Sequence, residues 1–200
     1  MSCPRPSASI GPAAMSNAQP LASRTDLIRR IDRPIVLVGL MGVGKSTIGR
    51  RLATALRRDF VDADEAIERA ANRTIAEIFA AHGEGYFRDG ERRVIARLIA
   101  ERRGVIATGG GAFVDPETRA LILHQGIAIW LDSDLATLVE RTSRNDNRPL
   151  LRNGDPEDIL RNLQQTRAPF YGEAQIHVKT DNGPHDATVH RILEELDAWL

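Results

Sequence analysis

Residues 39–47 read Gly-Leu-Met-Gly-Val-Gly-Lys-Ser-Thr and contain the spacing Gly-x4-Gly-Lys-Ser. An apolar run precedes them and an amphipathic stretch follows, which is the strand, loop and helix context that this motif requires. The glycines let backbone N–H groups converge on phosphate oxygens, and the helix that follows adds its N-terminal partial charge. The alternative is a glycine-rich turn with an incidental lysine, but such a turn would not explain why a strand precedes the motif and a helix follows it. The motif therefore predicts a phosphate-binding loop (P-loop) for a nucleotide.

Charged and hydroxyl side chains near this loop suggest a metal and an acceptor. Lys45 is expected to reach the β- and γ-phosphates, and Ser46 to offer its hydroxyl to Mg²⁺, a cation that prefers oxygen ligands. Asp62 and Asp64 stand at alternating positions at the end of a second short strand, where ligands of open α/β sheets bind. One carboxylate would serve the Mg²⁺ and the other an acceptor hydroxyl. The alternative is that Asp64 only caps the next helix.

Further along the chain, three clusters combine arginines, aromatic residues and glycines. They are Phe87-Arg88 with Glu91 three positions later, the triple glycine 109–111, and Arg148-Pro-Leu-Leu followed by Arg167-Ala-Pro-Phe-Tyr. Each cluster is weak evidence when taken singly, because most arginines on helices lie in solvent or form exposed ion pairs.

The elements that must position these residues alternate between short apolar runs and longer amphipathic ones, which predicts a parallel sheet with crossover helices. Strands are expected at 35–38, 60–61, 105–108, 127–131 and 176–178. Helices are expected at about 45–56, 65–71, 75–81 and 84–103, with Thr74 as a cap and Gly83 and Gly104 as stops. The polar stretch 144–156 reads as a loop of the kind that often forms a lid, although an ordinary surface connection has the same composition.

Length and composition limit the function classes. With 200 residues the chain has room for one good core, and its formal net charge of zero gives no general attraction for nucleic acid or anionic membranes. No apolar run has the length of a membrane span, and a single cysteine excludes a disulfide scaffold. We therefore expect a cytoplasmic monomer that binds neither nucleic acid nor membrane.

The first segment lacks acidic residues up to position 25 and shows no sustained hydrophobic period. We predict a disordered N-terminal extension over residues 1–30 and a single P-loop domain over 31–200. A targeting peptide is the alternative for the extension, but its few arginines and missing amphipathic pattern disfavour that function.

Taken together, the order and spacing of these motifs resemble the shikimate kinase family of P-loop kinases, from about Ile31 to the C-terminus. The matching strings are the P-loop at 39–47, Phe-Val-Asp-Ala-Asp at 60–64, Phe-Arg at 87–88, Gly-Gly-Gly at 109–111, Arg-Pro-Leu-Leu at 148–151 and Arg-x-Pro-x-Tyr at 167–171. The resemblance implies a three-layer α/β P-loop fold with a five-stranded parallel sheet. It also implies a helical substrate-binding region at about 62–91 and a lid at about 144–156.

The resemblance further implies transfer of the terminal phosphate of ATP to the 3-hydroxyl of shikimate, with Mg²⁺ as cofactor. Asp64, Lys45 and Arg148 would be catalytic, and Ser46 and Asp62 would order the metal. ATP would contact Gly42, Val43, Gly44, Lys45, Ser46, Thr47, Arg141 and Arg148. Shikimate would contact Asp64, Phe87, Arg88, Gly109, Gly110, Gly111 and Arg167.

The physical logic of the acceptor half is consistent with this assignment, because paired guanidinium groups match a carboxylate in two-bond geometry. One departure is that residues 180–185 lack an arginine that some relatives place near adenine. A kinase for another hydroxylated acid, such as gluconate, is the nearest rival. A nucleotide-dependent switch is a rival of another class, but the chain has neither an Asn-Lys-x-Asp nor an Asp-x-x-Gly motif to support it.

Overall fold

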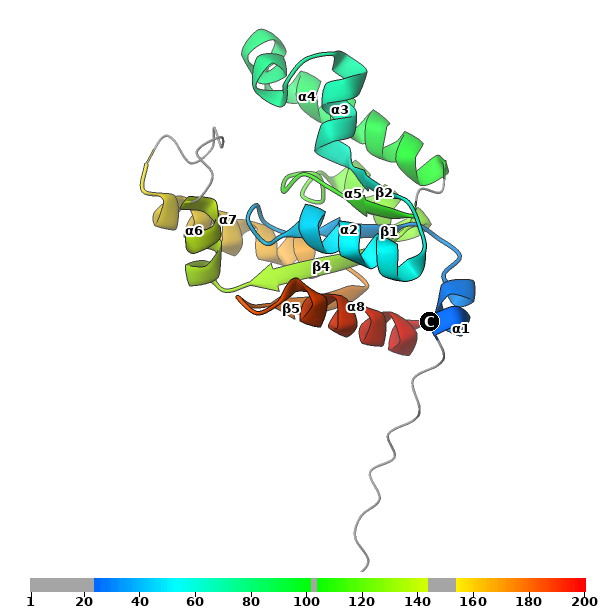
Figure 1. Cartoon of the computed structure of the whole chain (residues 1–200). Helices are drawn as coiled ribbons and strands as arrows, with labels where there is room; N and C mark the ends of the chain where they lie inside the picture. The colour runs from blue at the N-terminus through cyan, green and yellow to red at the C-terminus, as the bar shows by residue number, and fades with distance from the viewer. Residues whose placement is uncertain (1–23, 102–103, 144–153) are drawn as a thin grey trace, which may run out of the picture.

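The computed structural model describes residues 24–101, 104–143 and 154–200. In this part of the chain five parallel strands form one sheet in the order β2-β3-β1-β4-β5, so the predicted five-stranded parallel sheet is confirmed (Figure 1). Three of the strands, β2, β4 and β5, end one or two residues later than predicted, and β3 ends one residue earlier. They are β1 (Ile35–Val38), β2 (Phe60–Asp62), β3 (Val105–Ala107), β4 (Ile127–Ser133) and β5 (Ile176–Thr180).

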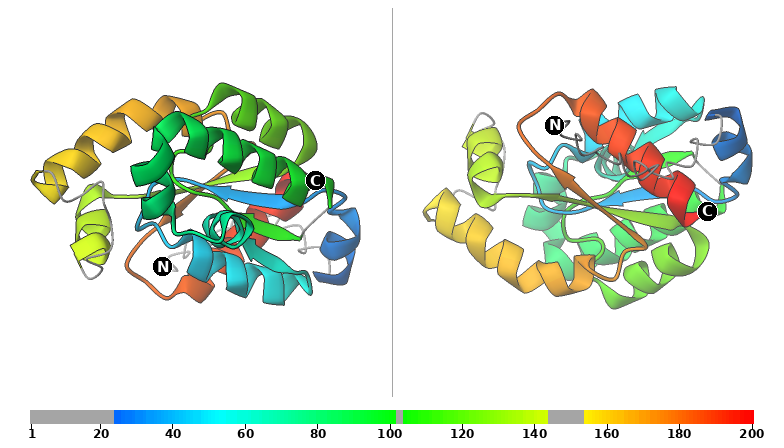
Figure 2. Two further views of the ribbon diagram at one scale, coloured as in Figure 1. Left: turned by 90° about the horizontal axis from the view of Figure 1, so that it is seen from above. Right: turned by 90° about the horizontal axis from the view of Figure 1, so that it is seen from below.

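Helices cover both faces of the sheet, which gives the three layers that the sequence predicts. Figure 2 shows α2 and α8 on one side of the strands, and α5 and α7 on the other. The helices are α1 (Arg24–Arg30), α2 (Lys45–Leu56), α3 (Ala63–Ala71), α4 (Ile75–Ala100), α5 (Pro116–Gln125), α6 (Leu135–Ser143), α7 (Pro156–Tyr171) and α8 (His185–Trp199).

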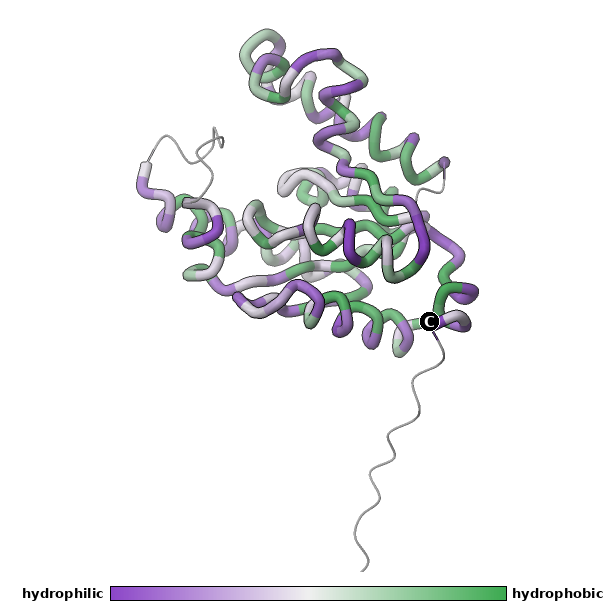
Figure 3. The backbone as a smooth tube through the Cα atoms, in the orientation of Figure 1, coloured by the Kyte–Doolittle hydropathy of each residue, from purple (hydrophilic) through white to green (hydrophobic). Residues whose placement is uncertain are grey.

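The central strand β1 carries the core and fixes the position of the P-loop. All four of its residues are fully buried, since helices cover both of its faces and strands β3 and β4 pair with its two edges. Figure 3 shows hydrophobic residues along the inner parts of the fold, and helices such as α8 alternate between hydrophobic and polar positions. Because all five strands are parallel, their carboxyl ends meet at one edge of the sheet, where the loops after β1, β2 and β3 come together.

Helix α3 and the first half of α4 project beyond this edge, whereas the second half of α4 returns to the core, in which Ile95 and Ile99 are buried (Figure 1). Thr74 caps α4 as predicted: its hydroxyl accepts from the Glu77 N–H, and the Glu77 carboxylate accepts from the Thr74 N–H. Gly83 interrupts the helix as predicted, because α4 consists of two helical segments that are joined across a kink at this residue. Gly83 has φ 77° and ψ −179°, a non-helical conformation that glycine adopts without steric cost.

The N-terminal boundary needs a correction. Residues 24–30, which fall inside the expected disordered extension of 1–30, form helix α1, and Leu27 of this helix is buried in the core. A side chain on α1 also ties the two ends together, because Arg30 donates to the Asp197 carboxylate at 2.6 Å. The remainder of the extension and most of the expected lid, residues 144–153, lie outside the described residues. Within the described ranges, no helix has both the length and the apolar character needed to cross a bilayer.

Candidate active site

The P-loop connects the end of β1 to the first residue of α2. Gly44 precedes the helix with φ 97°, a left-handed conformation that favours glycine. Lys45 is buried, and its ammonium group donates to the carbonyls of Gly39 and Leu40, both at 2.8 Å. These bonds hold the lysine across the concave side of the loop. The loop N–H groups, the lysine and the N-terminus of α2 form an anion-binding concavity.

Two oxygen donors lie side by side next to the P-loop. The Ser46 hydroxyl donates to Oδ2 of Asp62 at 2.6 Å. The other carboxylate oxygen of Asp62 accepts from the Asp64 N–H at 3.0 Å and caps α3. The helix-capping role considered for Asp64 therefore belongs to Asp62, because β2 continues to residue 62 and α3 begins one residue later. Asp64 is left free of capping and lines the cavity described below.

Asp64 occupies an environment that disfavours its ionised form. Burial raises the pKa of the Asp64 carboxyl above its ordinary value, and the negative charge of Asp62 raises it further. The positive charges of Lys45 and Arg88 lower the pKa of Asp64, but by less than burial and Asp62 raise it. A carboxylate with a raised pKa in a cleft is a common property of a general base.

Arg88 is clamped by two glutamates of its own helix. Its Nη1 donates to Glu91 Oε2 at 2.6 Å, and its Nη2 and Nε donate to Glu84 at 3.2 and 3.3 Å. Burial acts to lower the pKa of Arg88, but Glu91 and Glu84 outweigh it and raise that pKa. Burial also raises the pKa of Glu91, against the effect of Arg88. The clamp fixes the guanidinium in one orientation at the mouth of the cleft.

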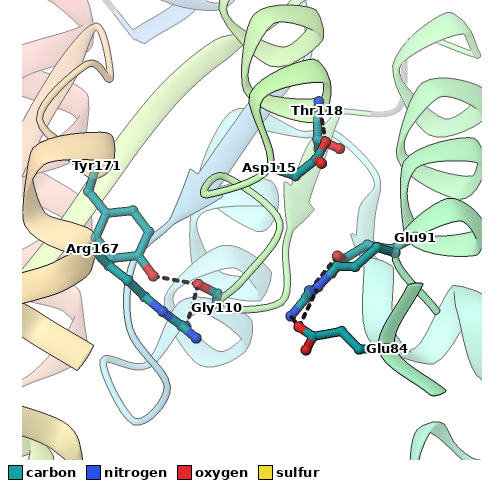
Figure 4. A network of polar contacts seen from close by, with 8 residues as sticks. Glu84, Glu91, Gly110, Asp115, Thr118, Arg167 and Tyr171 are labelled. Atoms are coloured by element: carbon teal, nitrogen blue, oxygen red, sulfur yellow. Dashed lines mark hydrogen bonds and ion pairs between the residues drawn. The ribbon is translucent and has the colours of Figure 1, made fainter. Parts of the chain in front are cut away.

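The triple glycine after β3 passes between this clamp and helix α7. Figure 4 shows Arg167 and Tyr171 of α7 directed at the carbonyl of Gly110, with Glu84 and Glu91 on the other side of the loop. Nη1 of Arg167 donates to this carbonyl at 2.9 Å, and the Tyr171 hydroxyl donates to the same oxygen. Two cationic side chains, Arg88 and Arg167, therefore flank one stretch of half-buried backbone.

Tight packing explains why glycine occupies two of these three positions. A Cβ added to Gly111 would lie 2.5 Å from Nη2 and 2.7 Å from Cζ of Arg88. A Cβ at Gly109 would lie 2.8 Å from Oδ1 of Asp64 and 2.9 Å from Oε1 of Glu91. These distances are shorter than real Cβ contacts. Glycine is therefore required at these two positions, because charged side chains lie directly against the backbone.

A single cavity of about 950 Å³ joins the P-loop to the arginines and the triple glycine. Two predicted residues are not in its lining: Val43 is buried beneath the P-loop, and Arg148 lies outside the described residues. Arg141 reaches the cavity from α6, held by the carbonyls of Val43 at 3.2 Å and Asp181 at 2.6 Å. The predicted residues that line the cavity are Gly42, Gly44, Lys45, Ser46, Thr47, Asp62, Asp64, Phe87, Arg88, Gly109, Gly110, Gly111, Arg141 and Arg167.

Comparison with known proteins decides the family. The family model described as shikimate kinase matches residues 41–197. The shikimate kinase of Novosphingobium aromaticivorans is 61% identical over 176 residues, covering 86% of this chain and 91% of that protein. This chain belongs to the shikimate kinase family.

Solved structures agree with this family assignment. The shikimate kinase of Acinetobacter baumannii, solved in complex with shikimate, superposes with a TM-score of 0.78 at 40% identity, covering 81% of this chain and 91% of that one. A gluconokinase from Sinorhizobium meliloti superposes with a TM-score of 0.55 at 18% identity, covering 85% of this chain and 94% of that one. The second likeness shows a shared fold alone. The predicted P-loop fold and the predicted shikimate kinase family are both confirmed.

Sequence reasoning quoted two polar residues of this shikimate kinase but gave them no role in the site. Glu91 is 2% exposed and its Oε1 has no hydrogen-bond partner among the described residues, while Tyr171 is 1% exposed and anchors Gly110. The spacing of Glu91 three residues after Arg88 was visible in the sequence, and i, i+3 pairs of opposite charge face each other on a helix. What the spacing does not reveal is burial, which is set by the glycine loop packing against α4.

Proposed function

We propose that this member of the shikimate kinase family transfers the γ-phosphoryl group of ATP to the 3-hydroxyl of shikimate, a step in aromatic amino-acid biosynthesis. The observation that carries the proposal is the single cavity that has a P-loop at one end and two arginines with Asp64 at the other. Family membership and the shikimate-complexed relative support the same acceptor. Phosphoryl transfer depends mainly on alignment and countercharge, and this cavity offers both.

At the acceptor end, Arg88 and Arg167 are proposed to hold the carboxylate of shikimate. Guanidinium groups bind carboxylates through paired, charge-assisted hydrogen bonds, and these two flank the backbone of Gly109–Gly111. Phe87 packs against Phe79 with ring centroids 4.6 Å apart and offers an apolar surface for the ring of the acceptor. The segment at about 62–91, which carries Asp64, Phe87 and Arg88, is thus proposed as the substrate-binding region of a kinase domain over 31–200.

Asp64 is proposed to orient the acceptor hydroxyl and take its proton. Its raised pKa makes it a better proton acceptor than an ordinary aspartate, while Lys45 and Arg88 act to lower that pKa. Lys45 is proposed to bind the β- and γ-phosphates after leaving the two loop carbonyls that it contacts in this structure. On the family resemblance, Arg148 is proposed to add positive charge at the transferring phosphate.

Mg²⁺ is the proposed cofactor, with Ser46 and Asp62 as the residues that order it. Their oxygens lie 2.6 Å apart at the first turn of α2, and hard oxygen donors of this kind fit Mg²⁺. When bound, Mg²⁺ neutralises charge on the phosphates of ATP. Asp62 is fixed independently by its cap on α3, so this donor pair does not depend on a ligand for its position.

The test is a coupled assay of ADP release with ATP, Mg²⁺ and either shikimate or gluconate. Shikimate should be phosphorylated, and gluconate should give no turnover above the ATPase background. Turnover with gluconate and none with shikimate would refute the acceptor assignment. Removing Arg148 by Arg148→Ala should lower turnover more than it changes the KM for shikimate. The chain is also proposed to act as a monomer, which light scattering on the purified protein will check.

A further inference from the structure

A second cavity, of about 380 Å³, lies between α3 and α4. Apolar residues line most of it, with Ile67 and Ala71 from α3 and Ile78, Phe87 and Val94 from α4. Phe87 also lines the large cavity of the active site, so one aromatic ring separates the two spaces. The second cavity is of a size that holds a small organic molecule, and neither the phosphate transfer nor the acceptor site uses it.

Two arginines on successive turns of α4 give this apolar cavity a positive charge. Arg93 and Arg97 line it, and none of the described residues in its lining is acidic. Among the residues that the structure describes, Arg93 has no ion-pair or hydrogen-bond partner, and the ion pair of Arg97 is a long one, with 3.9 Å between its Nε and Oε1 of Glu101. Their neighbour Arg92, which points elsewhere, pairs with both Asp89 and Glu117. The cavity therefore combines an apolar floor with the positive charge of two arginines.

An exposed aromatic residue completes the lining. Tyr86 is 54% exposed, and its ring packs against His82 with centroids 4.4 Å apart, so the ring is held in place although solvent reaches it. A fixed aromatic surface beside apolar side chains favours a flat aromatic ligand. The arginines favour a carboxylate on that ligand, because a guanidinium matches a carboxylate in two-bond geometry.

We propose that the cavity between α3 and α4 is a binding site for a small aromatic carboxylate. The ring would lie among Ile67, Ile78, Tyr86 and Phe87, and the carboxylate would pair with Arg93 and Arg97. This site is distinct from the acceptor site, whose cationic groups are Arg88 and Arg167 on the other side of Phe87. It also differs in charge, because the active-site cavity is lined by acids as well as arginines.

The test uses 2-naphthoate as the probe and 2-naphthamide, its uncharged isostere, as the control ligand, with calorimetric titration of the full chain. Titrations are run with and without saturating shikimate, because the acceptor site also attracts carboxylates. We expect 2-naphthoate to bind in both conditions and 2-naphthamide to bind at least tenfold more weakly. Failure of 2-naphthoate to bind at millimolar concentration, or its complete displacement by shikimate, would overturn the proposal.

Substitutions in and near the cavity test whether 2-naphthoate binds there. Arg93→Ala with Arg97→Ala should weaken 2-naphthoate at least tenfold, and Ala71→Trp should abolish binding by filling the cavity without altering its charge. Arg69→Ala removes an exposed arginine of α3 outside the lining and should leave binding unchanged. All these variants should keep the circular dichroism spectrum of the parent chain, and the double arginine variant, whose two positions lie outside the proposed substrate-binding region, should keep its kinase turnover. Undiminished binding to either the double arginine variant or Ala71→Trp would refute the site.

Discussion

Replacing Gly111 by alanine would place a methyl group where the guanidinium of Arg88 now lies. The added Cβ would be 2.5 Å from Nη2 and 2.6 Å from Nη1, whereas ordinary contacts begin at 3.4 Å. The guanidinium must therefore move by roughly 0.9 Å, the difference between 3.4 and 2.5 Å. Because it is the far end of a flexible side chain, the chain should still fold, and the cost should fall on the position of Arg88.

The size of that cost follows from the bonds that the shift would break. The 2.6 Å bond from Arg88 to Glu91 would stretch towards the limit of hydrogen bonding, and the same guanidinium is proposed to hold the carboxylate of shikimate. A hydrogen bond to a charged group contributes about 1.5–3 kcal/mol. At about 1.4 kcal/mol per tenfold, losing one such bond to the acceptor would raise the KM for shikimate about 10- to 150-fold.

Steady-state kinetics with shikimate varied at saturating ATP measure this effect. The KM for ATP should stay within about twofold, since the P-loop does not contact Gly111, and only interactions made to the acceptor are lost. Gly85→Ala is the matched control, because a Cβ there meets nothing within 4 Å and lies on the same helix as Arg88. A Gly111→Ala enzyme with unchanged KM for shikimate would refute the argument that this glycine exists to admit Arg88.

Four further outcomes follow from the same contacts. Asp64→Asn should lower turnover by about 10²- to 10⁴-fold. The melting temperature of this variant should exceed that of the parent at pH 7, and the two should converge near pH 3. The reason is that folding raises the pKa of the Asp64 carboxyl, and such a group destabilises the folded state only above its unfolded pKa. The parent therefore loses stability as the pH rises from the unfolded pKa to the raised folded pKa. Glu91→Gln should raise the KM for shikimate by roughly tenfold through a less firmly held Arg88, and an unchanged KM would contradict the clamp. Chelation of Mg²⁺ by EDTA should abolish turnover without changing the melting temperature, and added Mg²⁺ should restore it. Thr74→Ala should lower the free energy of unfolding by about 1 kcal/mol in a denaturant titration while turnover is kept.

The nucleotide half of the site could be predicted because its signals are local. The P-loop string, the apolar run before it and the helix after it are contiguous, and each constrains the conformation of its neighbours. The cap at Thr74 was predictable for the same reason, since a capping box needs only two residues three positions apart. Helix α1 was missed because its burial depends on packing near the C-terminal helix, as the bond from Arg30 to Asp197 shows.

The residues of the acceptor half could be named from the sequence, but their arrangement in space could not be predicted from it. The residue types alone left the roles of Asp62 and Asp64 interchangeable, and only the family resemblance assigned Asp62 to the metal and Asp64 to the acceptor. Two acids one residue apart at a strand end look alike until the start of the helix is known. The structure separates them: Asp62 caps α3 and bonds to Ser46, which leaves Asp64 facing the cavity with a raised pKa. A difference of one residue in where β2 ends thus decides which carboxylate is available for a substrate.

The three glycines after β3 illustrate why the remaining part depends on three dimensions. From the sequence they were predicted to contact shikimate, and that prediction rested on the family resemblance. In the structure Gly109 lies against Asp64 and Glu91, the carbonyl of Gly110 accepts from Arg167 and Tyr171, and Gly111 lies beneath Arg88. One loop therefore sets the spacing between the proposed base and both proposed carboxylate-binding arginines. The base and the two arginines come from α3, α4 and α7, so a shift of this loop would change the distances between them without changing the residues themselves. Substitutions in the loop should therefore weaken binding of the acceptor far more than binding of ATP.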